Sequence, residues 1–235
     1  MKILAIDTST EACSAALYMD GELIERYLVE PRKHIELLKP MVEEVMQEAE
    51  VDVNDLTGLA FGAGPGSFAG LRVACAFIQG MGAGLDIPVV PVSTLKAMAQ
   101  QVLDSHPERT VLVILDAKMK EVYWGVYRKE DKEVVTVLPE KVTKIDDIPN
   151  FTGIVGLANI IGAGDGWNVV PNWVEALKPE LIEKNVYPRA GEIALLAIDD
   201  FENGMALDAD QVSPIYLRNN IALTVEEQKA LKKEV

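Results

Sequence analysis

The chain has 235 residues, of which 49% are hydrophobic and 25% charged, and its formal net charge is −15. This composition excludes large-scale disorder, and the length allows one large domain or two small ones. Binding to nucleic acid needs a surplus of Lys and Arg, so the acidic balance disfavours an RNA-binding role for this chain alone.

The N-terminus carries no signal-peptide pattern, and no uninterrupted run of about 18 apolar residues occurs in the chain. We therefore expect a cytoplasmic protein that does not contact a membrane. The two cysteines, Cys13 and Cys75, lie in apolar surroundings and are interpreted as buried thiols in a reducing compartment. Two cysteines make neither a disulfide framework nor a zinc site.

Three strands are predicted at the start of the chain. Residues 3–7, 13–19 and 23–29 have the apolar or alternating pattern of strands, and Asp20-Gly21 between the last two is a strong hairpin signal. Tight turns between them indicate an antiparallel meander.

Residues 33–50 show helical periodicity, with Pro40 expected to bend this helix or to mark its first turn. The apolar arc covers roughly 180°, against roughly 100° for a helix that packs on one side. The additional width predicts a second packing surface, either in the protein's own core or on another chain. The residues of this arc are Ile35, Leu37, Leu38, Met41, Val42, Val45, Met46 and Ala49.

A strand at 58–62 leads into the glycine-rich segment 63–70 and a helix at 68–84, with Ser67 as its N-cap. The loop is not a P-loop, because no Gly-Lys-Ser/Thr follows. It would either present N–H groups to a phosphate or form a tight turn that needs positive φ, and we favour the turn. The many small residues of the helix lower its intrinsic stability but allow another helix to approach closely.

The next elements are a strand at 89–92 and a helix at 94–103, followed by a polar turn at 106–109 that we interpret as a lobe boundary. We therefore predict a first lobe at 1–108 and a smaller second lobe at 109–223. A charged tail follows at 224–235. Within the second lobe, the pattern predicts a helix at 190–199 and a short strand at 213–217.

An internal repeat relates the two lobes. Residues 4–18 and 113–127 match at an offset of 109, which pairs Asp7 with Asp116, and each copy reads as strand, Asp, turn and strand. Such a duplication is the hallmark of the actin-like ATPase superfamily. We therefore predict an α/β protein of two actin-like (ribonuclease H-like) lobes, each a mixed sheet flanked by helices.

Asp7 and Asp116 are candidates for a vestigial nucleotide cleft. In an active ATPase of this type, glycine-rich turns after these acids would let the backbone touch phosphates. The turns here, Thr8–Glu11 and Ala117–Glu121, contain no glycine, and their side chains would crowd and repel a phosphate. Tight ATP binding is therefore not expected, and we predict no cofactor.

A catalytic metal site is also not expected, because the two histidines, His34 and His106, do not form a pair at ligand spacing. Ser67 and Ser93 have no evident His and Asp partners for a serine triad. We predict no catalytic and no metal-binding residues.

Four segments together resemble one family closely: AIDTST at 5–10, GAGPGSFAGLRVACAFIQGMG at 62–82, PVVPVSTL at 88–95 and PIYLRN at 214–219. They resemble the bacterial TsaB (YeaZ) family, a subunit of the machinery that makes threonylcarbamoyladenosine in tRNA. Position 69 is Ala where the family more often has Thr.

The resemblance implies a degenerate actin-like protein that pairs with the catalytic subunit TsaD. That subunit transfers a threonylcarbamoyl group to adenosine 37 of ANN-decoding tRNAs, and the ATPase TsaE joins the assembly. Thr94 and Met98 occupy the places that correspond to its metal-binding histidines. The resemblance also implies tRNA contact only through the complex, and a homodimer when the partner is absent.

In the family, helices of the first lobe form the partner interface, and these correspond to 33–50 and 67–84. The expected interface residues are Ile35, Leu38, Met41, Val42, Val45, Leu71, Ala74, Cys75 and Ile78. We predict a scaffold or activator subunit rather than an enzyme. The alternative is an ATP-binding or peptidase-like hydrolase, which the actin-like hairpins and the family's older glycoprotease label would suggest.

Overall fold

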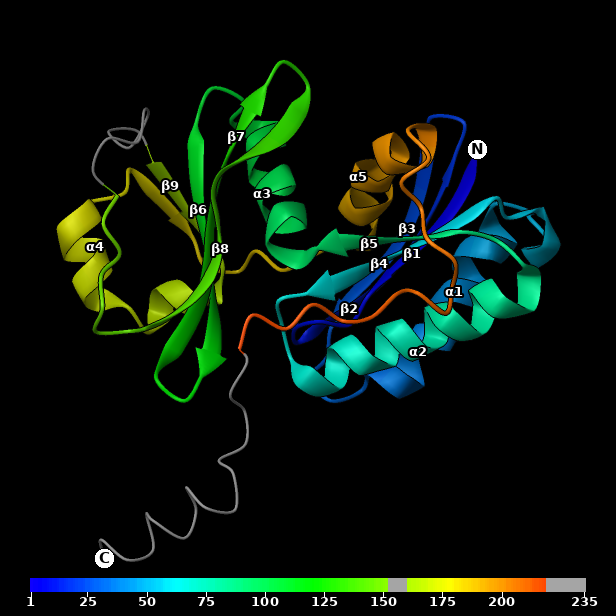
Figure 1. Ribbon diagram of the computed structural model, residues 1–235, viewed down its shortest axis with the longest axis horizontal. Coiled ribbons are helices and arrows are strands. Elements are labelled where there is room, and N and C mark those ends of the chain that lie inside the picture. Colours follow the sequence, from blue (N-terminus) through cyan, green and yellow to red (C-terminus); the bar gives the residue numbers. More distant parts are fainter. Residues whose placement is uncertain (152–159, 219–235) are drawn as a thin grey trace, which may run out of the picture.

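The computed structural model describes residues 1–151 and 160–218 of the chain. The expected tail at 224–235 and the last residues of the expected second lobe lie outside these ranges. Two five-stranded mixed sheets lie side by side with helices packed against them (Figure 1). The predicted α/β architecture of two lobes is confirmed.

The first sheet has the strand order β3-β2-β1-β4-β5. β1, β2 and β3 form the predicted antiparallel meander, and β1, β4 and β5 run parallel. Asp20 and Gly21, which connect β2 to β3, both have positive φ, 51° and 98°, as a two-residue hairpin turn requires. The strands are β1 Lys2–Asp7, β2 Ala12–Met19, β3 Glu22–Val29, β4 Gly58–Gly64 and β5 Val89–Ser93.

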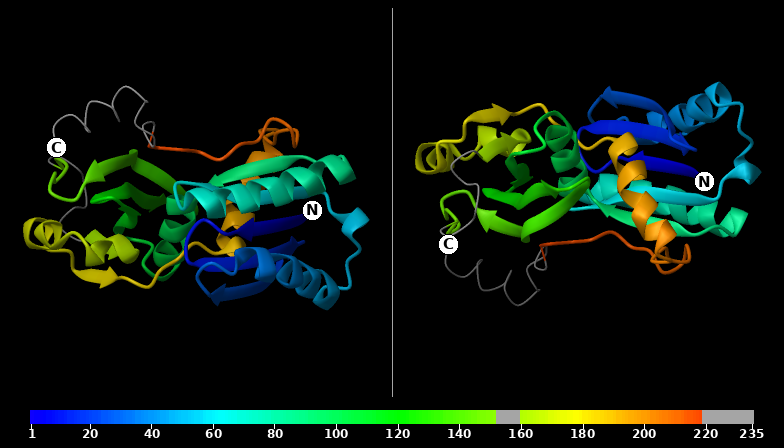
Figure 2. Two further views of the ribbon diagram at one scale, coloured as in Figure 1. Left: turned by 90° about the horizontal axis from the view of Figure 1, so that it is seen from below. Right: turned by 90° about the horizontal axis from the view of Figure 1, so that it is seen from above.

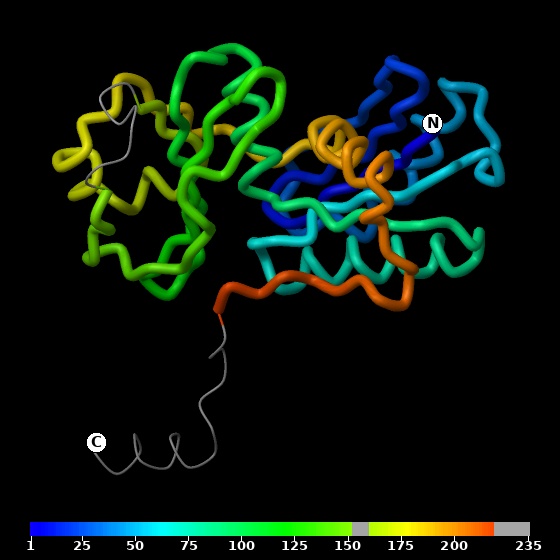
Figure 3. Tube along the Cα trace, turned by 45° about the horizontal axis from the view of Figure 1, so that its top comes forward, coloured from blue at the N-terminus to red at the C-terminus, as the bar shows by residue number. Residues whose placement is uncertain are grey.

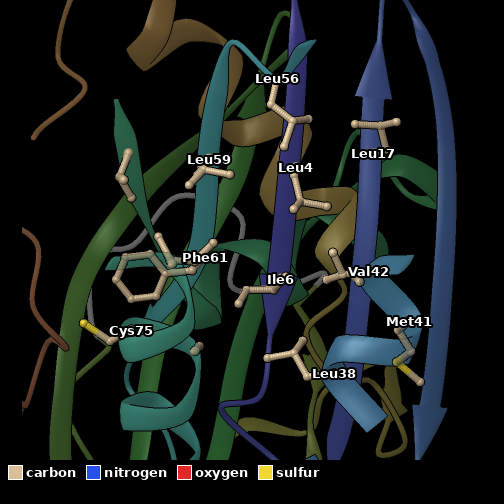
Figure 4. Close-up of a cluster of buried hydrophobic side chains, with 14 of the residues drawn as sticks. Leu4, Ile6, Leu17, Leu38, Met41, Val42, Leu56, Leu59, Phe61 and Cys75 are labelled. Atoms are coloured by element: carbon tan, nitrogen blue, oxygen red, sulfur yellow. The ribbon is translucent and has the colours of Figure 1, made fainter. Parts of the chain in front are cut away.

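Helices cover both faces of the first sheet. On one face lie α1 (His34–Glu48) and α2 (Phe68–Leu85), and on the other lies α5 (Ala190–Glu202). Successive residues of a strand point to opposite faces, so Leu4 and Ile6 of β1 pack toward α1 and α2 (Figure 4). The alternate residues Ile3 and Ala5 belong to the cluster that contains α5. A short 3₁₀ turn, η1 (Val53–Asp55), precedes β4.

The second sheet has the order β10-β9-β6-β7-β8, which repeats the first sheet strand for strand when β6 is matched with β1. Asp7 and Asp116 thus lie at equivalent hairpins. The elements are β6 Thr110–Lys118, β7 Glu121–Glu130, β8 Glu133–Lys144, β9 Ile160–Ala163 and β10 Leu181–Glu183, together with the 3₁₀ turn η3 Asp165–Asn168 and the helix α4 Pro171–Leu177.

Helix α3 (Thr94–Ser105) lies between the two sheets. Leu95 and Met98 pack into the core under β6, β7 and β9, whereas Ala97 joins the cluster around α5. The helix therefore contributes side chains to the cores of both lobes. The places that the family resemblance equates with metal-binding histidines, Thr94 and Met98, are both fully buried in it.

The second sheet begins at Thr110, close to the predicted boundary at 108, but the predicted second lobe, 109–223, includes residues that pack on the first sheet. Helix α5 follows the second lobe in sequence, yet it packs against β1, β2 and β4 of the first sheet, because its apolar face, which includes Ile193 and Ala197, fills the core there. Leu207 pairs with Val89 at the edge of the same sheet. The first lobe is therefore completed by the C-terminal part of the chain.

The strand predicted at 213–217 is wrong. This segment is irregular and runs alongside α2 toward the second lobe (Figures 2 and 3). Its backbone forms hydrogen bonds without joining a sheet. Ile215 N–H donates to Ala63 O at 2.7 Å, and Gln79 Nε2 donates to Val212 O at 2.9 Å. We call residues 212–218 the C-terminal strap.

Candidate functional site: the inter-lobe cavity and the outer face of helix α2

Asp7 ends β1 but does not face solvent. Its side chain is fully buried, and its Oδ1 accepts hydrogen bonds from the backbone N–H and the hydroxyl of Ser9, both at 2.9 Å. Oδ2 has no hydrogen-bond partner among the described residues and lies so close to Gly62 that a Cβ there would overlap it. Burial raises the pKa of Asp7 to about 7, although the bonds from Ser9 oppose this shift.

The glycine-rich loop packs directly on the turn that follows Asp7. Ser67 N–H donates to Ser9 O at 2.7 Å, and Thr8 Oγ1 donates to Gly70 O at 2.7 Å. A Cβ at Gly70 would overlap Thr8 O. The Ser67 N–H is thus already hydrogen-bonded to Ser9 within the chain. The Ser67 hydroxyl caps α2 by accepting from Gly70 N–H, as predicted.

The equivalent turn of the second lobe is open to the cleft. Asp116 accepts from Lys118 N at 2.7 Å and pairs with Lys118 Nζ at 2.8 Å, while its own N–H donates to Asp165 Oδ1 at 3.0 Å. The bond to Asp116 raises the pKa of the Lys118 ammonium, and burial raises the pKa of Asp165. The Lys118 ammonium is therefore already paired with a carboxylate of its own turn.

Both lobes line one cavity of about 610 Å³. Its walls come from the turn after Asp7, the starts of α1 and α2, the turn after Asp116, and the C-terminal strap. Of the two residues proposed for a vestigial cleft, Asp116 lines this cavity and Asp7 does not. The Asp7 carboxylate is fully buried beside the turn that follows it and the glycine-rich loop.

The outward face of α2 is almost free of polar side chains. Arg72 is the single charged residue of α2. A Cβ added at Gly80 or Gly84 would meet no atom within 4 Å. Apolar burial stabilises proteins in proportion to area, so an uncovered face of this composition favours contact with another surface. The exposed or half-exposed residues of this outer face are Ala69, Val73, Ala76, Phe77, Gly80, Ala83 and Gly84.

Eight of the nine residues expected at a partner interface are not on the surface. The wide apolar arc of the first helix and the inner stripe of the second fill the core over β1, β2 and β4 (Figure 4), so these side chains are at most 8% exposed. Ile35 is the exception, at 79% exposed. The eight buried residues are Leu38, Met41, Val42, Val45, Leu71, Ala74, Cys75 and Ile78.

The eight residues thus lie on the inner faces of α1 and α2. The small residues at 76, 80, 83 and 84 are the sequence signal for the outer face of α2, because they are exposed. By length and composition α2 could also cross a membrane, with 33% of its residues buried, but one such helix is weak evidence for a span. Cys13 and Cys75 are buried free thiols, as predicted.

The duplicated sheets and the inter-lobe cavity define a two-lobed actin-like protein. A family model described as "TsaD: tRNA N6-adenosine threonylcarbamoyltransferase" matches residues 29–224. Among solved structures, one described as an uncharacterized protein with similarity to peptidase YEAZ from Pseudomonas aeruginosa superposes with a TM-score of 0.84. It is 36% identical, over 92% of this chain and 99% of that one.

Curated relatives agree. A protein from Escherichia coli K12 named tRNA threonylcarbamoyladenosine biosynthesis protein TsaB is 33% identical, over 94% of this chain and 96% of its own length. The protein of the same name from Haemophilus influenzae is 32% identical, over 94% of this chain and 95% of its own. The chain belongs to the TsaB (YeaZ) family.

Proposed function

We propose that this protein is a non-catalytic subunit in the biosynthesis of threonylcarbamoyladenosine in tRNA, and that it binds a TsaD-type catalytic subunit through the outer face of α2. The observation that carries the proposal is this uncovered apolar face, where Ala76, Gly80 and Gly84 leave space for a second helix to approach closely. The names of the relatives supply the pathway.

The turns near Asp7 and Asp116 support a non-catalytic role. The carboxylate that would act in a nucleotide cleft is buried, and the loop beside it donates to its own chain rather than to a ligand. Among the described residues, no three His, Cys, Asp or Glu side chains gather where they could hold a metal ion. An activator that works by contact needs none of these groups.

The wider assembly follows from the same proposal. The ATPase TsaE would join through the complex, tRNA would be contacted only within it, and a homodimer would use the α2 face when the catalytic subunit is absent. A net charge of −15 fits a subunit that leaves the tRNA to its partner. The cytoplasm, where tRNA modification takes place, is the location that this role requires.

Two substitutions on α2 test the proposal. Ala76→Arg and Gly80→Arg place a long charged side chain on the outer face without entering the core. We expect each to weaken binding to the purified TsaD-type subunit from the same organism at least about 30-fold by isothermal titration calorimetry, because a central interface position of this kind is worth about 2 kcal/mol or more.

Leu195→Arg is the matched control, since Leu195 is an exposed apolar residue on α5, which covers the opposite face of the first sheet. It should bind as the unmodified chain does. Retained affinity in both α2 variants, with melting temperatures unchanged, would contradict the proposed interface.

A further inference from the structure

The two most exposed large hydrophobic side chains of the described residues are Ile35, at 79%, and Met119, at 75%. They come from opposite lobes, yet both line the inter-lobe cavity. Phe68 and Tyr216 line it as well and are also exposed, and their rings lie 5.5 Å apart. We call these four residues the apolar rim.

Met119 lies at the tip of the hairpin between β6 and β7. Lys118 pairs with Glu121, so Met119 and Lys120 are the two central residues of the turn, and their positive φ values, 55° and 60°, are those that a two-residue hairpin turn requires. Lys118, with φ 59°, follows a register shift in β6. The turn geometry therefore places the Met119 side chain at the exposed end of the hairpin.

The C-terminal strap contacts this turn through Arg218. Arg218 Nη2 donates to Ala117 O at 3.0 Å and to Lys118 O at 3.4 Å, and it pairs with Glu121 Oε2 at 2.5 Å. Arg218 Nη1 lies 3.6 Å from Met119 Sδ. A planar guanidinium with several fixed donors suits this task, which a lysine ammonium would perform less completely.

The same strap contacts the start of α2. Arg72 Nε lies 3.3 Å from Tyr216 OH, and the Arg72 guanidinium stacks over the Phe68 ring at 3.9 Å. The strap thus joins the helix with the uncovered outer face to the Met119 turn of the second lobe. The PIYLR segment, singled out in the sequence as part of a family signature, has its structural role here.

We propose that the apolar rim is a second contact region for the catalytic subunit of the proposed function, and that Arg218 is the positioning residue that presents Met119 to it. The inference rests on that function, because the catalytic subunit is proposed here on the ground that the apolar rim adjoins the outer face of α2. Val73 belongs both to the cavity wall and to the outer face of α2, and Ile35 and Phe68 lie in the first turns of α1 and α2. A chain seated on α2 therefore covers the rim and contacts both lobes.

Met119→Asp is the primary test, with Met205→Asp as the matched control, because Met205 is 65% exposed and does not line the cavity. We expect Met119→Asp to weaken binding of the purified catalytic subunit at least tenfold in calorimetry, and Met205→Asp to have no effect. Met119→Ala should give a smaller loss in the same direction. Equal affinity for all three variants would overturn the inference.

The role of Arg218 is tested by Arg218→Gln and by the double variant with Met119→Ala. If Arg218 acts through Met119, the two losses do not add, and amide hydrogen exchange at 117–121 becomes faster in Arg218→Gln. Arg218→Lys should recover part of the affinity. Fully additive losses, or unchanged exchange in Arg218→Gln, would contradict a positioning role.

The α2 variants separate this inference from the proposed function. Lost binding in Gly80→Arg with unchanged binding in Met119→Asp would refute the apolar rim alone, whereas unchanged binding in both would refute the proposed function. If Met119→Asp instead disrupts self-association in sedimentation and leaves the catalytic subunit bound, the occupant is a second copy of this chain and the inference is wrong.

Discussion

At the scale of single residues, Asp7 carries a fully buried carboxylate with hydrogen bonds to only one of its two oxygens. The residue ends β1 of the first sheet, and Ser9 donates both hydrogen bonds to that oxygen. The other oxygen faces Gly62 with no donor among the described residues. A buried carboxylate with half its hydrogen bonds missing favours the neutral form, as its raised pKa reflects.

This shift predicts a dependence of stability on pH. The unfolded carboxyl loses its proton near its ordinary pKa of 3.8, but the folded one keeps it to about 7. The folded state therefore binds more protons between these values, and its free energy of unfolding falls as pH rises through that window. Three pH units at 1.36 kcal/mol each give a loss of about 4 kcal/mol from Asp7.

Asp7→Asn isolates the effect, since Glu192, whose pKa burial also raises to about 7, titrates in the same window in both proteins. The variant should be less stable than the unmodified chain near pH 4, because its amide N–H groups lack acceptors beside Gly62. The difference should shrink or reverse by pH 8. Urea denaturation at several pH values measures it, and a constant difference would show that Asp7 is not the group responsible.

At the scale of elements, α2 uses glycine for two opposite purposes. Gly70 lies against the turn after Asp7, where a methyl group would overlap Thr8 O. Gly80 lies two to three turns further along and faces open space. The first glycine is required by the fold of this chain, whereas the second is not required by any contact within the described chain.

Alanine substitutions distinguish the two. Gly70→Ala should lower the free energy of unfolding by about 2–3 kcal/mol, because backbone must move to admit the methyl group. Gly80→Ala should raise it by about 0.5–1 kcal/mol, since the free chain gains helix propensity without a clash. Chemical denaturation of the two variants in parallel checks this, and a destabilising Gly80→Ala would show that position 80 is packed in the free protein.

At the scale of the whole molecule, two lobes with the same strand order enclose a cavity, as the actin-like ancestry predicts. Three features oppose nucleotide binding there: the burial of Asp7, the commitment of Ser67 N–H to Ser9, and the pairing of Lys118 with Asp116. We expect calorimetric titration of the isolated chain with Mg-ATP to show no micromolar binding. Micromolar binding that Asp116→Ala abolishes would restore the hydrolase alternative.

Local sequence patterns were enough to predict the duplicated strand–Asp–turn–strand unit, nearly every helix and strand of the first lobe, and the family. These depend on local patterning and short motifs: the meander with Asp20-Gly21 at its turn, the Ser67 cap, and the alternation in β1. Such signals are written within a few residues of where they act.

The remaining features depend on how distant parts of the chain pack together. Periodicity shows that a helix has a wide apolar arc but not which side meets its own core, so the interface prediction named Leu38 and Ala74, which are buried, and did not name the exposed Ala76 and Gly80. The return of α5 to the first sheet, the closure over Asp7 and the strap from α2 to the second lobe all join residues far apart in sequence. Contacts of that kind arise only when the whole chain is packed, and they determine which surfaces remain free for a partner.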